Sequence, residues 1–514
     1  MPSTTRVTDY TLAVVSGLLL ALSFPKFGQP AFAWIALAPL LLALTGWHGG
    51  AGRISGQPPL HAFLLGLATG VVYFVGTIYW TGTVIETFGE VPMVLAYGAM
   101  LLLALYLALF PAFTALVTGR LLARGGLAAL WFAPAAWVTT EFCRGWLFGG
   151  FPWVPLGNSQ VTVLPVAQLA SLVGVYGLSL LVAFVNTAIV YALLARGRAR
   201  AGAIAVAAVV LLTVGGWGTW RLAHDDLVRQ GTPIRVGLVQ GNIEQTLKWN
   251  PNEARRIFTT YIAMTRDVVK RGAQYVIWPE SSTPFMFEED PGGQAALRAL
   301  AREVGTPILF GSDQMVHGAM PALYNAAFLL GADGRTDAVY RKIHLVPFGE
   351  FIPLQRYLTF VSPLVDSLLD FSAGDAVVML PVDGHLTSTA ICYEVVYPSL
   401  IDAAVDAGSQ LLTTITNDAW YGHSSAPYQH WEMASMRAIE QGRYMARAAN
   451  TGISGIVDPY GRVVERSALF TEAGLVGEVR FLTDRTLYSR IGDALSYACI
   501  ALTALGLIVI RNRV

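Results

Sequence analysis

The sequence predicts a polytopic bundle of membrane-spanning helices joined to one α/β domain. Three observations lead to this prediction. The 514 residues are 54% hydrophobic and 13% charged, with a mean hydropathy of +0.52, which is too apolar for a soluble protein of this length. Long uncharged apolar runs gather in residues 1–220 and again near the C-terminus. Residues 221–492 instead alternate short β-branched runs with amphipathic stretches, as an α/β domain does.

The membrane region is predicted from apolar runs that can cross about 30 Å of hydrocarbon, which takes roughly 20 helical residues. Long runs together with shorter ones give about eight spans, the last of them in residues 493–514. The first run follows Arg6, but no small-residue cleavage site comes after it, so we expect a retained helix. The long runs cover residues 60–85, 91–119, 163–195, 201–220 and 494–510, and the shorter ones cover 10–22, 30–45 and 127–141.

The orientation of the bundle follows from basic residues in short loops, which accumulate on the cytoplasmic side. With about eight spans, the arginines near residues 6, 53, 120–124, 196–200 and 511–513 all fall on one face. The other face carries little beyond Lys26 and Arg144. We therefore expect both termini in the cytoplasm and the α/β domain on the opposite side of the membrane.

Several classes of function are disfavoured by composition. The 34 basic and 34 acidic residues cancel, so nothing suggests a nucleic-acid partner. The three cysteines are widely spaced and form no CxxC pair, which argues against a disulfide framework or a zinc site. The histidines of the α/β domain lack HExxH spacing. We expect neither a metal nor a cofactor.

Reactive side chains follow strand-like runs at three places in the α/β domain. Glu280 follows Trp278-Pro279, Lys342 follows Tyr340-Arg341, and Cys392 follows Ile391. Loops at strand ends commonly hold functional groups on a rigid sheet. A thiol can act as a nucleophile, a carboxylate can take its proton, and an ammonium can stabilise an oxyanion. A thiol with a pKa near 8.5 is only a few per cent thiolate around pH 7, so it needs such a partner.

Each of these residues also has a structural interpretation. An isolated cysteine at a strand end is commonly structural, a glutamate after proline is commonly a solvated turn residue, and a lysine beside an arginine is commonly surface charge. The combination of all three with their surrounding residues favours an active site.

The surrounding residues carry a family resemblance. The chain contains, in order, Trp-Pro-Glu at 278–280, Arg-Lys-Ile-His-Leu-Val-Pro-Phe-Gly-Glu at 341–350, Ile-Cys-Tyr-Glu at 391–394 and Thr-Asn-Asp-Ala-Trp-Tyr-Gly at 416–422. This set resembles the nitrilase superfamily. Joined to multiple membrane spans, it is similar to the apolipoprotein N-acyltransferase family over essentially the whole chain.

The resemblance implies that residues 221–492 form a nitrilase-like αββα sandwich with a Glu280, Lys342 and Cys392 triad. It also implies supporting roles for Glu350 and for Tyr393 and Glu394 beside the nucleophile. Trp249 matches a position that helps to hold the lipid-bearing loops. Three further residues could shape the pocket, although a turn after a strand explains the first two equally well; they are Asn417, Asp418 and Trp420.

By the same resemblance, the enzyme takes an acyl chain from a phospholipid, typically phosphatidylethanolamine. It passes the chain, through a Cys392 thioester, to the α-amino group of the N-terminal diacylglyceryl-cysteine of an apolipoprotein. The location implied is the bacterial inner membrane, with a periplasmic catalytic domain, and nothing in the sequence requires more than a monomer. The aromatic stretch at 145–153 either borders the lipid entrance or is a simple aromatic belt.

Two other functions are considered. The triad alone does not decide whether water or an amine resolves the acyl-enzyme, so a membrane-tethered amidase or hydrolase is the alternative. The many predicted spans argue against this alternative, because a tether needs only one. A transporter or scaffold with an inactive domain is disfavoured, because the spans carry almost no ionisable residues for a coupled ion pathway.

Overall fold

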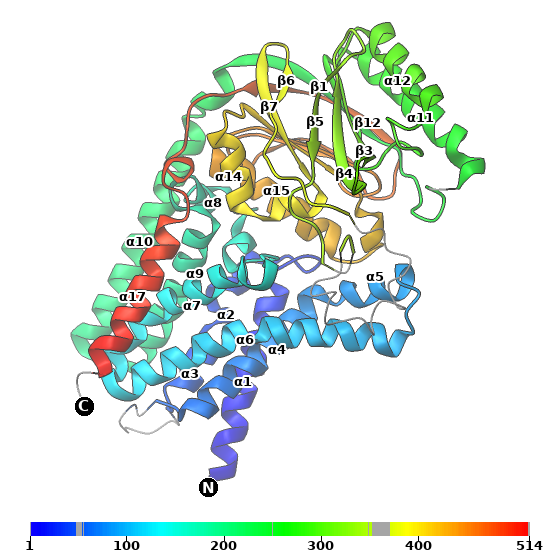
Figure 1. Cartoon of the computed structure of the whole chain (residues 1–514). Coiled ribbons are helices and arrows are strands. Elements are labelled where there is room, and N and C mark those ends of the chain that lie inside the picture. Colours follow the sequence, from blue (N-terminus) through cyan, green and yellow to red (C-terminus); the bar gives the residue numbers. More distant parts are fainter. Residues whose placement is uncertain are drawn as a thin grey trace. The chain divides into compact units, whose positions relative to one another are not determined.

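The computed structural model describes residues 2–47, 54, 56–248, 250–347, 349–351 and 371–511. The chain divides into two compact units (Figure 1). The first contains Met1–His224, Ser424–Glu432 and Arg490–Val514, and the second contains Asp225–His423 and Met433–Ser489. The first is helical and the second holds the β-sheets.

Prolines begin many helices of the first unit, at the first or second helical position. A proline fits there because the amide hydrogen that it lacks has no partner within the helix. Helix α16 (Tyr488–Ile491) precedes the C-terminal helix. The helices of the first unit are α1 (Pro2–Leu22), α2 (Pro30–Ala36), α3 (Ala38–Leu44), α4 (Pro59–Ile78), α5 (Trp80–Phe88), α6 (Met93–Gly125), α7 (Ala133–Arg144), α8 (Leu164–Ala167), α9 (Ala170–Leu194), α10 (Gly197–Ala223) and α17 (Ala494–Arg511).

The predicted membrane bundle is confirmed as a fold class. Among the described residues, four helical stretches are long and apolar enough to cross a membrane: Pro59–Ile78, Met93–Arg144, Ala170–Leu194 and Gly197–Arg229. Two shorter apolar helical stretches are Pro30–Leu44 and Ala494–Val509. The expectation of about eight spans stays a prediction.

The run predicted as one helix over 30–45 is broken at Leu37 into α2 and α3. The side chain of Asn186, in α9, fills the gap. Its Oδ1 accepts hydrogen bonds from the main-chain nitrogens of Leu37 (2.8 Å) and Ala38 (3.0 Å), and its Nδ2 donates to the carbonyl of Ala33 (2.9 Å). An unsatisfied main-chain group in hydrocarbon costs several kcal/mol. The hydrogen bonds of this buried amide avoid that cost and stabilise the break between the two helices.

A segment from late in the sequence completes the first unit. Gln429, within Ser424–Glu432, is fully buried. Its Oε1 accepts from Trp153 Nε1 (2.7 Å), and its Nε2 donates to the carbonyls of Thr77 (3.1 Å) and Pro25 (3.0 Å). One amide side chain thus joins three separate parts of the helical unit.

The described residues of the second unit form two six-stranded mixed sheets. In each sheet, three successive strands run parallel and the outer strands antiparallel. The first has the order β12 (Ala473–Phe481), β1 (Thr232–Gln240), β2 (Tyr275–Ile277), β3 (Ile308–Val316), β4 (Ala322–Leu330) and β5 (Thr336–Arg341). The second has the order β11 (Val463–Arg466), β10 (Gly455–Val457), β9 (Met445–Ala449), β8 (Leu411–Thr416), β7 (His385–Ile391) and β6 (Leu380–Val382).

The two sheets pack face to face. Inward-facing residues of the first sheet, such as Val236 and Leu238, share a core with Ile391 and Ile415 of the second. This pairing follows from strands that are apolar on both faces and therefore need cover on both sides.

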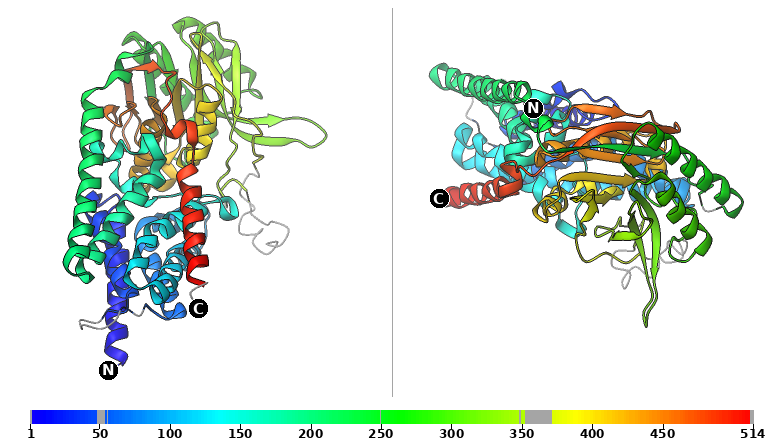
Figure 2. Two further views of the ribbon diagram at one scale, coloured as in Figure 1. Left: turned by 90° about the vertical axis from the view of Figure 1, so that its left-hand side faces the viewer. Right: turned by 90° about the horizontal axis from the view of Figure 1, so that it is seen from above.

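Helices cover the outer faces of the sandwich. The apolar stripes of α11 (Pro251–Lys270) and α12 (Pro291–Val304) pack on the outer face of the first sheet, in a core that includes Tyr261 and Leu297 (Figures 1 and 2). Helices α14 (Pro398–Asp406) and α15 (Ala426–Gln441) are the crossovers between the parallel strands β7, β8 and β9. Because crossovers of the same hand lie on the same face of a sheet, α14 and α15 both cover the outer face of the second sheet. The predicted αββα sandwich is confirmed.

Candidate active site

Cys392 lies on a sharp turn at the end of β7. It is the first residue of a short 3-10 helix, Cys392–Val396, and its φ of 53° lies in the left-handed region that non-glycine residues avoid. Such strain persists only where the surroundings fix the conformation. The Glu394 carboxylate does so, because its Oε2 accepts a hydrogen bond from the main-chain nitrogen of Ile391 (2.7 Å). The turn lifts the thiol out of the strand.

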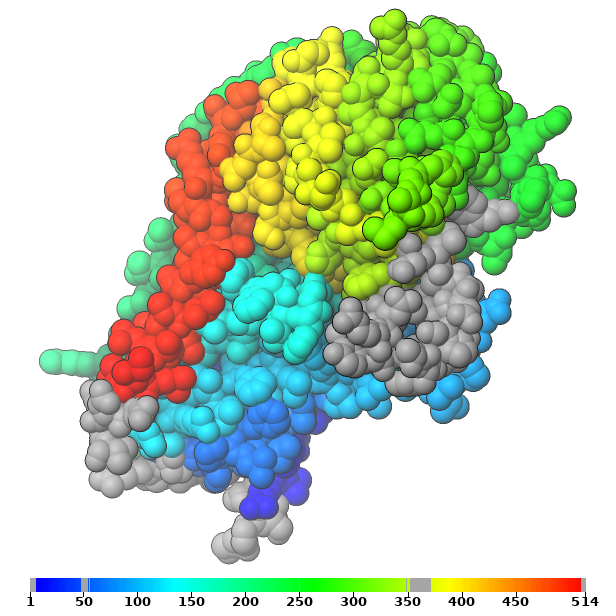
Figure 3. All heavy atoms as spheres, viewed as in Figure 1, coloured from blue at the N-terminus to red at the C-terminus, as the bar shows by residue number. Residues whose placement is uncertain are grey.

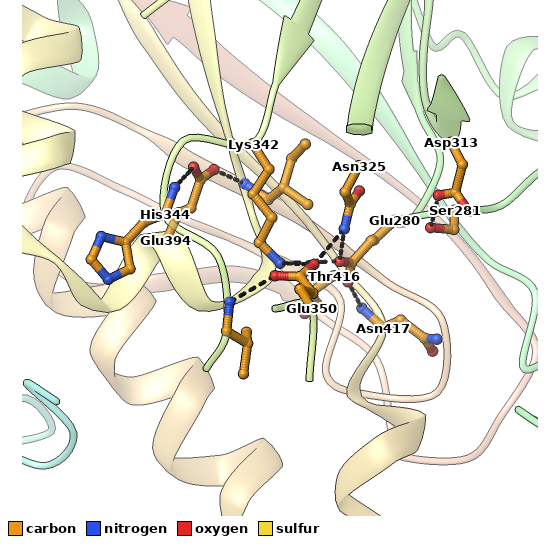
Figure 4. A network of polar contacts seen from close by, with 12 residues as sticks. Glu280, Ser281, Asp313, Asn325, Lys342, His344, Glu350, Glu394, Thr416 and Asn417 are labelled. Carbon is orange, nitrogen blue, oxygen red and sulfur yellow. Dashed lines mark hydrogen bonds and ion pairs between the residues drawn. The ribbon is translucent and has the colours of Figure 1, made fainter. Parts of the chain in front are cut away.

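Glu280 follows β2 and is held by its carboxylate. Its Oε1 accepts from Asn325 Nδ2 (2.8 Å) and its Oε2 from the main-chain nitrogen of Asn417 (2.9 Å). Lys342 Nζ lies 3.6 Å from Oε1. Figure 4 shows Glu280, Lys342 and Asn417, which follow different strands, converging on Asn325 of β4. The carboxylate is therefore fixed in direction before any substrate binds.

Lys342 lies between two carboxylates. Its ammonium is 1% exposed and is 2.7 Å from Glu350 Oε1, while Asn325 Nδ2 donates to the same oxygen (3.0 Å) (Figure 4). Glu350 Oε2 accepts from the main-chain nitrogen of Val346 (2.8 Å). Burial opposes the charge of Lys342, but the carboxylates of Glu350 and Glu280 outweigh it and raise the pKa of this lysine. The site thus holds a permanent cation.

Glu394 joins the lysine loop to the cysteine turn. Its Oε1 accepts from Tyr340 Oη (2.8 Å) and from the main-chain nitrogens of Ile343 (2.7 Å) and His344 (3.1 Å). Burial raises the pKa of the Glu394 carboxyl to about 7, although these hydrogen bonds and Lys342 oppose the rise. Because the Glu394 carboxyl group is hydrogen-bonded to both the lysine loop and the cysteine turn, the positions of Lys342 and Cys392 depend on each other.

The Cys392 thiol is protonated at rest. Burial, followed by the charge of Glu280, raises the pKa of Cys392 to about 12, although Lys342 and a hydrogen bond with Thr416 act in the other direction. A preformed thiolate is therefore not the resting species. The proton must leave as the sulfur attacks, which requires a base beside it.

This protonation state gives a first prediction. Alkylation of Cys392 by iodoacetamide should speed up roughly tenfold per pH unit from about pH 7 to 9, with no plateau, because only the thiolate reacts. Peptide mass mapping resolves Cys392 from the other two cysteines. A plateau below about pH 9 would contradict the raised pKa.

The structure brings most of the predicted site residues together. Glu280, Lys342, Glu350 and Glu394 form one hydrogen-bonded and ion-paired network, and Asn417 joins it through its main chain (Figure 4). Cys392 lies close enough to this network for the charges of Glu280 and Lys342 to affect the pKa of its thiol. Tyr393 is buried against the rings of His344 and Tyr397. Trp420 is 38% exposed, in the 3-10 turn Asp418–Tyr421. Trp249 lies outside the described residues.

Sequence reasoning missed two buried polar groups. Asn325, in β4, bonds both Glu280 and Glu350. Lys248 donates to the Glu280 carbonyl. Asp418, which the sequence did indicate, forms a fully buried ion pair with Arg447 (2.8 Å). The only signal for Asn325 was an amide inside an apolar strand. No group of three or more His, Cys, Asp or Glu residues suited to a metal ion occurs in the described residues.

Comparison with known proteins identifies the family of the chain. The model of the apolipoprotein N-acyltransferase N-terminal domain matches residues 16–188, and that of carbon-nitrogen hydrolase matches 235–483. The apolipoprotein N-acyltransferase of Geobacter metallireducens is 40% identical over 501 residues, which are 96% of this chain and 93% of that protein. This chain belongs to the apolipoprotein N-acyltransferase family. Family relatives from Methylococcus capsulatus and Azotobacter vinelandii are 36% and 37% identical, over 94% and 98% of this chain and 92% and 95% of theirs.

As a member of the apolipoprotein N-acyltransferase family, the chain is an acyltransferase, as predicted. The reading as a transporter or scaffold with an inactive domain is therefore wrong. Among solved structures, a mutant amidase of the nitrilase superfamily from Nesterenkonia is 20% identical with a TM-score of 0.41, over 53% of this chain and 98% of that one.

Proposed function

We propose that the protein transfers an acyl chain from a phospholipid, with phosphatidylethanolamine as the expected donor, to an apolipoprotein. The acceptor is the α-amino group of an N-terminal diacylglyceryl-cysteine, and the carrier is a Cys392 thioester. The observation that carries this proposal is the buried ammonium of Lys342 between the Glu280 and Glu350 carboxylates, in electrostatic contact with the Cys392 thiol. Family membership supports lipid-linked substrates.

The first half-reaction loads the enzyme. Glu280 takes the thiol proton as the sulfur of Cys392 attacks the ester carbonyl carbon, and a C–S bond forms. Lys342 faces the oxyanion, where one such donor is worth about 3 kcal/mol in the transition state. When the intermediate collapses, the C–O bond breaks, and the lysophospholipid oxygen takes the proton back from Glu280. The product is a thioester.

The second half-reaction transfers the acyl chain from Cys392 to the acceptor amine. The amine attacks the thioester carbonyl, Glu280 takes one amine proton, and the C–S bond breaks as the thiol recovers that proton. A thioester is a more activated acyl donor toward an amine than an ester is, which suits cysteine to transfer. The Cys392 side chain is nearly buried, at 6% exposure, and exclusion of water protects a reactive intermediate from hydrolysis.

The proposal includes a membrane arrangement. The catalytic domain, residues 221–492, is periplasmic in a bacterial inner membrane, both termini are cytoplasmic, and the enzyme acts as a monomer. The loop arginines support this orientation. Aromatic side chains near the η2 turn, Leu147–Gly149, support lipid access at 145–153, because Phe148 is 85% exposed and Trp146 is 56% exposed. This segment lies at the surface in the cyan part of Figure 3.

The test is detection of the acyl-enzyme by intact mass. Wild type incubated with phosphatidylethanolamine should gain one acyl chain, and Cys392→Ala should gain none. A diacylated lipopeptide should then discharge the chain onto its amine. If the wild-type protein is never acylated, or if it discharges only to water, the tethered hydrolase becomes the better account.

A further inference from the structure

A second lysine lies buried beside the triad and has no role in the mechanism above. Lys248 is 5% exposed, and its Nζ donates to the main-chain carbonyl of Glu280 (3.2 Å). An ammonium loses its hydration on burial, so it persists only with compensating charges and hydrogen bonds. The carboxylates that act on it are those of Glu280 and Asp313. Glu280 is the base of the proposed mechanism.

The chain turns sharply where Lys248 holds it. Ser281 has a φ of 40°, in the left-handed region, which costs free energy for a residue with a side chain. Its hydroxyl donates to Asp313 Oδ1 (3.2 Å) from β3. Gly311, also in β3, lies so close that a Cβ there would stand 2.7 Å from Glu280 Cα and 2.4 Å from the nitrogen of Ser281. The turn is therefore clamped from several sides.

We propose that Lys248 and Asp313 are positioning residues for Glu280. Lys248 holds the Glu280 carbonyl, Asp313 holds the Ser281 hydroxyl, and together they fix the turn from which the Glu280 carboxylate reaches Lys342. Figure 4 shows Ser281 and Asp313 on the side of Glu280 away from Lys342. This inference rests on the proposed role of Glu280 as the base.

The charge of Lys248 adds a second effect. Burial lowers the pKa of Lys248 to about 8, and burial raises the pKa of Asp313 to about 6. Near neutral pH both groups are therefore charged. The three carboxylates of Glu280, Glu350 and Asp313 then face two ammonium groups, so Lys248 lowers the net negative charge that Lys342 alone would leave. A positive charge here favours the ionised forms of the base and of the attacking sulfur.

The experiment compares Lys248→Met with Lys248→Arg and with Arg443→Met. Arg443 is a matched control, because it is a buried cation that donates to the carbonyls of Ser409 and Thr483, outside the site. Single-turnover acylation of the full-length protein by phosphatidylethanolamine is followed against pH and phospholipid concentration. Iodoacetamide alkylation of Cys392 is followed in parallel by peptide mapping.

Lys248→Met should slow acylation about tenfold to a hundredfold at saturating phospholipid and leave the half-saturating concentration unchanged. The acid limb of its pH–rate profile, where the acylation rate falls at low pH, should move up by about one pH unit. The reason is that a nearby positive charge is lost. Lys248→Arg should restore the acid limb. Asp313→Asn should move the limb in the opposite direction, since it removes a negative charge.

Other outcomes overturn the inference. It fails if Lys248→Met keeps the wild-type rate and acid limb, or if Arg443→Met reproduces the same shift. Should Lys248→Met not fold, Ser281→Ala replaces it, because it removes the Asp313 tether, and an unchanged acylation rate refutes the clamp. If wild type forms no thioester, the proposed function fails. The alkylation series then decides alone: slower alkylation in Lys248→Met but not in Lys248→Arg supports the Lys248 role, and equal rates refute it.

Discussion

Glu280→Gln should lower the rate of Cys392 acylation by about 10²–10⁴-fold, the range of a general base, while the protein stays folded. The thiol pKa of about 12 means that attack requires simultaneous removal of its proton. Glutamine has the shape of glutamate but cannot take that proton. It also presents one acceptor oxygen where the carboxylate uses two, toward Asn325 Nδ2 and the nitrogen of Asn417.

The measurement is single-turnover formation of the thioester, with thermal unfolding of the same preparation as a check of the fold. Glu289→Gln is the matched control, since Glu289 is an exposed glutamate that pairs with His317. It should behave as wild type in both assays. An acylation rate for Glu280→Gln within about threefold of wild type, far inside the range expected for a base, would remove Glu280 from the role of base.

The sequence was most informative where local structure alone places a residue. Glu280, Lys342 and Cys392 each follow a strand, and loops at strand ends commonly hold functional groups. The period of the β-branched runs and the amphipathic helices indicated the α/β layers for the same reason. Prediction of these features needs no knowledge of which strands pair.

What the sequence could not indicate depends on long-range contacts. Asn325 reaches Glu280 and Glu350 because β4 lies between β3 and β5 in the sheet. Lys248 reaches the Glu280 carbonyl from the loop after β1. Similarly, hydropathy gives one helix over 30–45, whereas Asn186 of a distant helix stabilises two. Periodicity along the chain does not contain such contacts.

Lys342→Met should be the most damaging change to stability and to activity together. It leaves the buried carboxylates of Glu280 and Glu350 without their shared cation. Removing one partner of a buried ion pair costs about 3–5 kcal/mol of folding free energy. Loss of the oxyanion donor should lower acylation a further 10²–10³-fold among molecules that remain folded. Thermal unfolding in detergent and single-turnover acylation measure the two effects on the same sample.

The double variant Lys342→Met with Glu350→Gln separates these two effects. Glu350→Gln removes one of the two unpaired charges, so the double variant should unfold at a higher temperature than Lys342→Met alone, a coupling expected for groups in direct contact. Its acylation rate should stay as low as that of the single variant, because no cation faces the oxyanion. Recovery of stability without activity assigns Lys342 two separable roles, as counter-ion and as oxyanion donor. Recovery of both would mean that the ammonium serves only to neutralise Glu350.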